Sequence, residues 1–102
     1  MLFSLSTEEG AQILRIEGEL HALSAVDLRP IIQRIGEERP SLLLVDLSKL
    51  RLIDASGVGA LVDLYMTVRA NQGKMAVVNI RDQPLAILRV LGLDRVLMRD
   101  VA

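Results

Sequence analysis

The sequence predicts an α/β fold, and two observations on its 102 residues lead to that class. Short apolar runs alternate with segments whose apolar residues recur at helical spacing, in the order β-β-α-β-α-β-α. Strands that alternate with helices call for a layered structure with right-handed crossovers. Hydrophobic residues make up 51% of the chain and aromatic residues 2%, so the predicted core is sizeable and aliphatic.

The first half of the chain reads as a hairpin followed by a helix. Residues 2–6 and 11–18 are the expected strands, with a turn signal at 8–10. Residues 28, 31, 32 and 35 are all Leu or Ile and give the helix one apolar face. Ser24 is a candidate N-cap, but Pro30 also suits a helix that starts near Arg29, so the beginning of the helix stays open.

The central stretch 42–61 is the most informative part of the chain. Residues 42–45 (Leu-Leu-Leu-Val) predict a strand buried on both faces, and residues 52–53 add a second apolar step. Asp54-Ala55-Ser56-Gly57 follows, and a helix is expected over about 56–70. Ser56 should therefore lie at the beginning of a helix that follows a buried strand.

The remaining segments complete one domain over residues 1–102. Residues 75–80 form a further short apolar run, typical of a strand. The next helix is expected after Asp82, with Pro84 early in it and Gly92 at its end. Residues 96–98 are either a last short strand or a helical turn. We find no internal repeat or linker.

Composition argues against several classes of function. The net charge is −1, the twelve Lys and Arg residues form no block, and two aromatic residues cannot supply base stacking, so no nucleic acid is expected. Without cysteine and with one histidine, neither a metal nor another cofactor is expected. No apolar run approaches ~18 residues and no signal peptide is recognisable, so we expect a cytoplasmic protein without a membrane span.

Ser56 is the residue with the largest number of possible chemical roles. Backbone N–H groups in the first turn of a helix lack intrahelical partners and attract anions, and those of residues 56–58 could hold a phosphate. Gly57 and Gly59 keep side-chain bulk low, so another protein could approach the hydroxyl. The serine could cap the helix, act as a nucleophile or accept a phosphoryl group.

Three enzymatic or nucleotide-binding interpretations are weaker. Ser56, His21 and either Asp54 or Asp46 supply the residue types of a hydrolase triad, but a nucleophile elbow needs glycine where Asp54 stands. Asp46 ends a strand as a phosphoaspartate would, yet an acidic pair and a following lysine are missing, and capping of the loop 47–50 is the simpler role. The glycines at 57 and 59 lack the Gly-Lys-Ser/Thr of a nucleotide-binding loop.

Residues 44–61, LVDLSKLRLIDASGVGAL, closely resemble the signature of STAS domains, in particular the bacterial anti-sigma factor antagonists. Weaker matches follow in the same order at 16–20, 69–73 and 90–93, so the resemblance covers about residues 11–96. It implies a small mixed β-sheet with helices packed largely on one side.

The resemblance also implies a function without catalysis. Ser56 is then the phosphoacceptor for a serine kinase that is itself an anti-sigma factor. The unmodified protein binds that kinase, and a metal-dependent serine phosphatase restores the unmodified form. Asp54 would orient the acceptor, and Gly57 would permit close approach. His21 stands where antagonists often have an acidic residue.

The predicted partner-facing surface consists of four residues near the motif, His21, Ser24, Ala55 and Val58. STAS domains also occur as docking modules in stressosome proteins, in transporter tails and in lipid-transport complexes. The alternative is therefore a constitutive docking subunit in which Ser56 only caps its helix.

Overall fold

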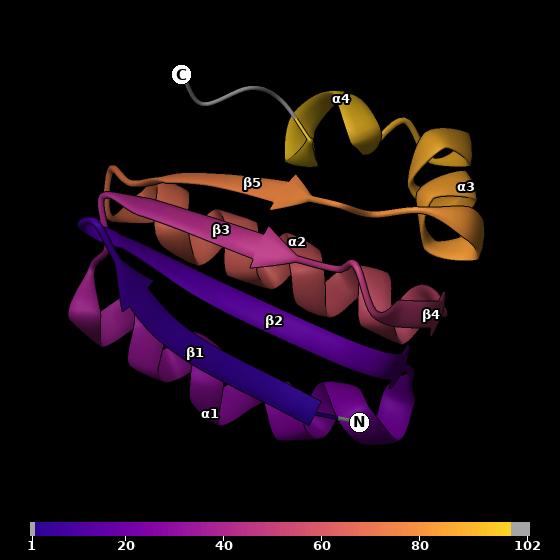
Figure 1. Cartoon of the computed structure of the whole chain (residues 1–102), viewed down its shortest axis with the longest axis horizontal. Coiled ribbons are helices and arrows are strands. Elements are labelled where there is room, and N and C mark those ends of the chain that lie inside the picture. Colours follow the sequence, from indigo (N-terminus) through magenta and orange to yellow (C-terminus); the bar gives the residue numbers. More distant parts are fainter. Residues whose placement is uncertain (1, 99–102) are drawn as a thin grey trace.

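The computed structural model describes residues 2–98, and Figure 1 shows their arrangement. The elements are β1 (Leu2–Glu8), β2 (Ala11–Leu20), α1 (Ala22–Glu38), β3 (Leu42–Asp46), β4 (Leu50–Ile53), α2 (Ala55–Ala70), β5 (Lys74–Val78), α3 (Asp82–Val90) and α4 (Asp94–Leu97). The predicted order of strands and helices is confirmed except at one place: residues 52–53, expected only as a second apolar step, belong to a separate strand, β4. The segment at 96–98 belongs to a helical turn, one of the two forms expected for it.

The strands form one mixed sheet, as expected. β1 and β2 pair antiparallel as the predicted hairpin, and β3 and β5 continue the sheet with parallel pairing in the order β1-β2-β3-β5. β4 pairs in parallel with the last part of β2, at Gly18–Leu20, beyond the stretch of β2 that pairs with β3. The ends of β2 and β4 therefore lie side by side, and each leads into a helix.

α1 and α2 lie behind the sheet in Figure 1 and pack against each other. Alternate strand residues point toward them: Leu14 and Ile16 of β2, Leu43 and Val45 of β3, and Met75 and Val77 of β5 are buried. The two helices contribute Leu28, Ile35, Leu61, Leu64 and Val68 to the same core. This layer is aliphatic, as the composition predicts, and it fixes the two helices side by side.

The expectation that residues 42–45 are buried on both faces is wrong. Leu43 and Val45 are fully buried, whereas Leu42 and Leu44 are only half-buried. The reason is that α1 and α2 share one face of the sheet, so the side chains that alternate to the other face receive less cover.

The beginning of α1 also differs from the expectation. The N-cap is His21, whose Nδ1 accepts a hydrogen bond from the Leu23 amide at 3.3 Å. Ser24 is three residues on and completes the capping box, because its Oγ accepts from the His21 amide at 2.9 Å. Pro30 consequently lies inside the helix, on its exposed side, and does not mark its start.

Candidate functional site

The beginning of α2 is fixed by Asp54. This residue is the N-cap, and its Oδ1 accepts a hydrogen bond from the Gly57 amide at 3.0 Å. Its own amide donates to the backbone oxygen of Leu20 at 3.2 Å. The N-cap therefore ties α2 to the end of β2 as well as to β4.

Ser56 is exposed in the first turn of α2, two residues after the cap. Among residues 2–98 its hydroxyl is not engaged in a protein hydrogen bond, and the cap belongs to Asp54 instead. The suggestion that Ser56 caps this helix is therefore wrong, because a residue already inside the first turn is past the capping position. A free hydroxyl at a helix beginning can receive a phosphoryl group without loss of a structural bond.

The amides that remain free at this helix end are fewer than expected. The Gly57 amide is bonded to the Asp54 side chain, and the Val58 amide donates to the Asp54 backbone oxygen at 2.9 Å. An anion on Ser56 would therefore meet the amides of Ala55 and Ser56, which have no carbonyl one turn earlier in the helix to bind. The expectation of free amides at Gly57 and Val58 is wrong.

Gly57 has a different role from the one expected. It is buried, and a Cβ on it would meet the backbone oxygen of Leu20 and the side chain of Ile53. The space left by its missing side chain is filled by the end of β2, so it brings α2 close to the sheet and is not open to a partner. Gly59, by contrast, is exposed and has open space where its Cβ would be.

Two of the four residues expected on a partner-facing surface are in fact buried. Ser24 is 5% exposed, and its Oγ donates to the backbone oxygen of Glu19 at 2.8 Å. Val58 is 8% exposed and belongs to the core. Both lie on the inward side of their helices. Ala55 is exposed and His21 is half-buried, so these two remain accessible.

A groove between the first halves of α1 and α2 was not foreseen from the sequence. Ser56, Gly59 and Asp63 line it from α2, and Ala22, Val26 and Arg29 line it from α1. Its small residues recur three or four positions apart on each helix, a signal that could have been read once the two helices were known to be neighbours. Ser56 thus opens into a shallow groove that carries one charge of each sign, Arg29 and Asp63.

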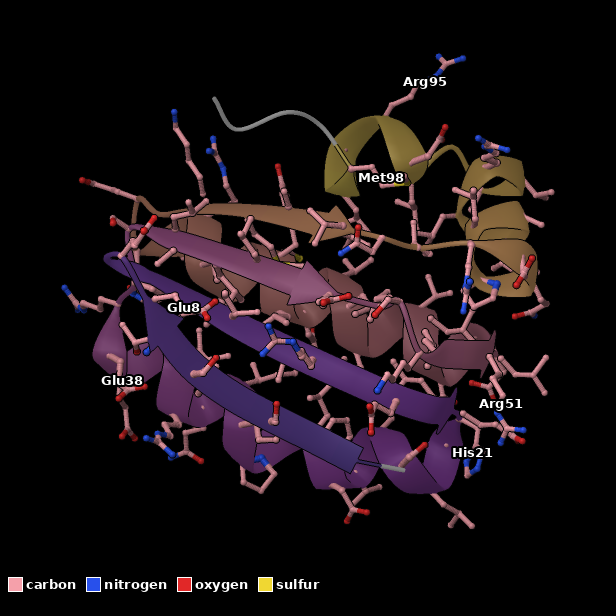
Figure 2. All side chains as sticks on the ribbon, viewed as in Figure 1. Glu8, His21, Glu38, Arg51, Arg95 and Met98 are labelled. Atoms are coloured by element: carbon pink, nitrogen blue, oxygen red, sulfur yellow. The ribbon has the colours of Figure 1, made fainter. Side chains whose placement is uncertain are left out.

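Exposed apolar side chains also gather at this end of the molecule. Leu23 is 78% exposed, Val26 is 54% exposed and Leu52 is 47% exposed. Leu23 and Val26 lie in the first turns of α1, and Leu52 lies two residues before Asp54. His21 lies between the two elements, lining one hollow with Leu23 and another with Leu52. Figure 2 shows His21 near Arg51 at this end, and Arg51 pairs with Glu19 at 3.5 Å.

The structure also bears on the role of Asp46 and on the possible hydrolase triad. Asp46 accepts a hydrogen bond from the Ser48 amide at 2.9 Å, which confirms the loop-capping role. Its pKa is raised by partial burial but lowered more by hydrogen bonds from Ser48 and Asn79 and by the charge of Arg15, so the net shift is downward. For a triad, His21 would have to bind Ser56; in the part of the chain that the structure describes, its Nδ1 receives the Leu23 amide instead.

Comparison with known proteins assigns the chain to a family. The chain matches the STAS domain family over residues 3–101, so it belongs to that family. No helix within residues 2–98 has the length and apolarity that a bilayer crossing requires.

Solved structures share the fold at low sequence identity. The anti-sigma factor antagonist SpoIIAA in its unphosphorylated form has a TM-score of 0.82 at 20% identity, over 99% of this chain and 89% of its own. An anti-sigma factor antagonist from Mycobacterium paratuberculosis has a TM-score of 0.84 at 20% identity, over 98% and 86%. A sulfate transporter family protein from Wolinella succinogenes has a TM-score of 0.76 at 22% identity, over 90% and 75%.

Proposed function

We propose that this protein is an anti-sigma factor antagonist controlled by phosphorylation of Ser56. In its unmodified form it binds an anti-sigma factor that is also a serine kinase, and the bound sigma factor is released. A metal-dependent serine phosphatase reverses the modification. The protein acts in the cytoplasm by binding and is not an enzyme. The observation that carries the proposal is the exposure of the Ser56 hydroxyl in the first turn of α2.

The surroundings of Ser56 suit a surface that binds a partner. Leu23, Val26 and Leu52 are apolar and exposed on the two elements that flank it. Burial of apolar surface is the dominant favourable term in most protein–protein association. We therefore assign the partner-facing surface to these three residues together with His21 and Ala55, in place of Ser24 and Val58.

Phosphorylation would alter this surface by charge. A phosphate on Ser56 adds about −1.5 to −2 charges. Asp54 and Asp63 carry like charges nearby, and a partner fitted to a neutral hydroxyl would have to bury the added anion. The amides of Ala55 and Ser56 and the positive end of α2 would reduce the cost to the domain itself. Binding would therefore weaken while the fold persists.

The first experiment is phosphorylation followed by intact mass. Purified protein is incubated with an anti-sigma serine kinase and Mg-ATP, and a gain of one phosphate is expected. Ser56→Ala should abolish the gain, whereas Ser41→Ala, at an exposed serine before β3, should not. A phosphate that persists in Ser56→Ala would contradict the assignment.

A second candidate is a constitutive docking subunit of a stressosome-like or lipid-transport complex. Its support is the fold shared with a protein of the sulfate transporter family. Binding measurements separate the two functions. Ser56→Asp should weaken binding to the kinase at least tenfold if phosphorylation controls it, and should leave partner affinity unchanged for a docking subunit.

A further inference from the structure

A side chain from a distant part of the sequence forms hydrogen bonds with the edge of β4 that faces away from β2. In the sheet, β4 pairs with β2 on one side only. On the other side, Gln83 of α3 takes the place of a neighbouring strand. Its Oε1 accepts a hydrogen bond from the Ile53 amide at 2.9 Å, and its Nε2 donates to the Ile53 backbone oxygen at 2.9 Å.

This pair of hydrogen bonds fixes the backbone of Ile53, the residue that precedes the Asp54 cap of the phosphorylation site. In a strand, the amide and carbonyl of one residue point to the same edge, and those of the next residue point to the opposite edge. Ile53 accordingly faces Gln83, while Asp54 faces β2 and donates to Leu20 at 3.2 Å. The junction between β4 and α2 is thus held from both sides, three residues before Ser56.

The backbone next to Gln83 adopts an uncommon conformation. Asp82 has φ of +57°, in the left-handed region that non-glycine residues rarely adopt. Such conformations persist where the surrounding structure holds them, and they gather at functional sites. At this turn the backbone places the next residue, Gln83, against β4, against which α3 packs.

We infer that Gln83 is a positioning residue for Ser56: its paired hydrogen bonds hold the Ile53–Asp54 junction so that the hydroxyl is presented in a fixed place. The inference rests on the proposed function for its consequence, and on the geometry at Ile53 for its cause. The same contact couples α3 to the site, because a movement of α3 would be transmitted to the beginning of α2 through the Gln83 side chain.

The structural half is tested by amide hydrogen exchange. Gln83→Leu removes both bonds with little change in size, and Gln83→Asn keeps both groups on a stem too short to reach. In each variant, exchange of the Ile53 amide should rise at least tenfold relative to that of Val45 in the centre of β3, and exchange at Gly57 should rise with it. Gln33→Leu, at an exposed glutamine whose amide meets only Glu37, is the control and should change neither.

The functional half is tested by the kinetics of phosphorylation with the same anti-sigma kinase. Because misplacing a reacting atom slows the chemical step, kcat should fall about tenfold or more in Gln83→Leu. KM does not discriminate here, since Gln83 lines one hollow with His21 and Leu52 of the partner-facing surface, so the positioning role is read from kcat. Loss of stability alone would lower the folded fraction and leave both constants of the folded protein unchanged.

The outcomes separate the two proposals. If Ile53 stays protected, or if it exchanges freely while kcat is unchanged, the positioning role of Gln83 is wrong and the phosphorylation of Ser56 stands. If the wild-type protein accepts no phosphate, the proposed function fails. The positioning role is then upheld only if increased exchange at Ile53 extends to Gly57, and is overturned if it stops at Ile53.

Discussion

The backbone oxygen of Leu20 lies where a side chain on Gly57 would begin. This contact joins the end of β2 to the first turn of α2, directly beside the hydrogen bond from the Asp54 amide to the same oxygen. The two strand ends and the helix beginning therefore act as one packed unit, and Ser56 is carried on its outer side.

Replacement of Gly57 by alanine should destabilise the protein by about 1–3 kcal/mol, because the added methyl group would overlap backbone that cannot move aside. Urea unfolding at neutral pH measures the loss. Gly59→Ala is the matched control in the same helix: its Cβ has open space, so a gain of up to about 1 kcal/mol is expected. Equal stabilities for the two variants would show that α2 packs differently.

Removal of the Ser24 hydroxyl should cost about 1–3 kcal/mol. In Ser24→Ala the partly buried amide of His21 and the carbonyl of Glu19 each lose a partner at the beginning of α1. Thermal or urea unfolding would reveal the loss, and Ser41→Ala, at an exposed serine, should stay within about 0.5 kcal/mol of the wild type. Affinity for the partner, measured on folded protein, should not change.

Loss of the cap at Asp54 should destabilise α2 by about 1 kcal/mol in Asp54→Ala, since the Gly57 amide would lose its acceptor. Asp54→Ser retains a capping oxygen and should recover most of the loss. The comparison by urea unfolding also separates two roles of this residue. If Asp54→Ser is stable yet poorly phosphorylated, the carboxylate contributes to the acceptor site beyond its structural bond.

The role of the exposed apolar side chains near Ser56 in partner binding can be tested by truncation of Leu23. Because Leu23 is 78% exposed, Leu23→Ala should leave stability within about 0.5 kcal/mol of the wild type. If it is a central contact, affinity for the anti-sigma kinase should fall about tenfold, measured by calorimetry. Met66→Ala, at a methionine of α2 that is 62% exposed, is the control. A Met66 effect equal to that of Leu23 would place the partner elsewhere.

Asp46 should make stability depend on pH in the acid range. Its carboxylate is 16% exposed and paired with Arg15 at 3.6 Å, and its pKa in the folded protein lies below the ordinary 3.8. Its ionised form therefore stabilises the fold above about pH 4, and the contribution disappears as the pH falls through the lowered pKa. Asp46→Asn should be less stable than the wild type at pH 7, and the difference should shrink as the pH falls below 3.8. A difference that does not change with pH in the acid range would contradict the lowered pKa, which the hydrogen bonds from Ser48 and Asn79 and the charge of Arg15 produce.

The order of the other strands and helices, the first hairpin and the place of Ser56 at a helix beginning were predictable from the sequence, whereas β4 was not predicted as a separate strand. These features depend on local signals: the period of apolar residues, the turn residues at 8–10, and the polar segment between residues 53 and 58. The same local signals named Ser24 as a cap but could not separate it from His21, because either side chain can accept a hydrogen bond at the beginning of a helix, and in the structure both do.

Only the tertiary structure decided what lies around Ser56. Ser24 and Val58 were expected at the surface because they are close to the motif in sequence, but the packing of their helices on the sheet turned them inward. The groove with Arg29 needs α1 and α2 to be neighbours, and Gln83 reaches Ile53 across 30 residues of chain. Such contacts depend on how distant segments meet, which a single sequence read locally does not specify.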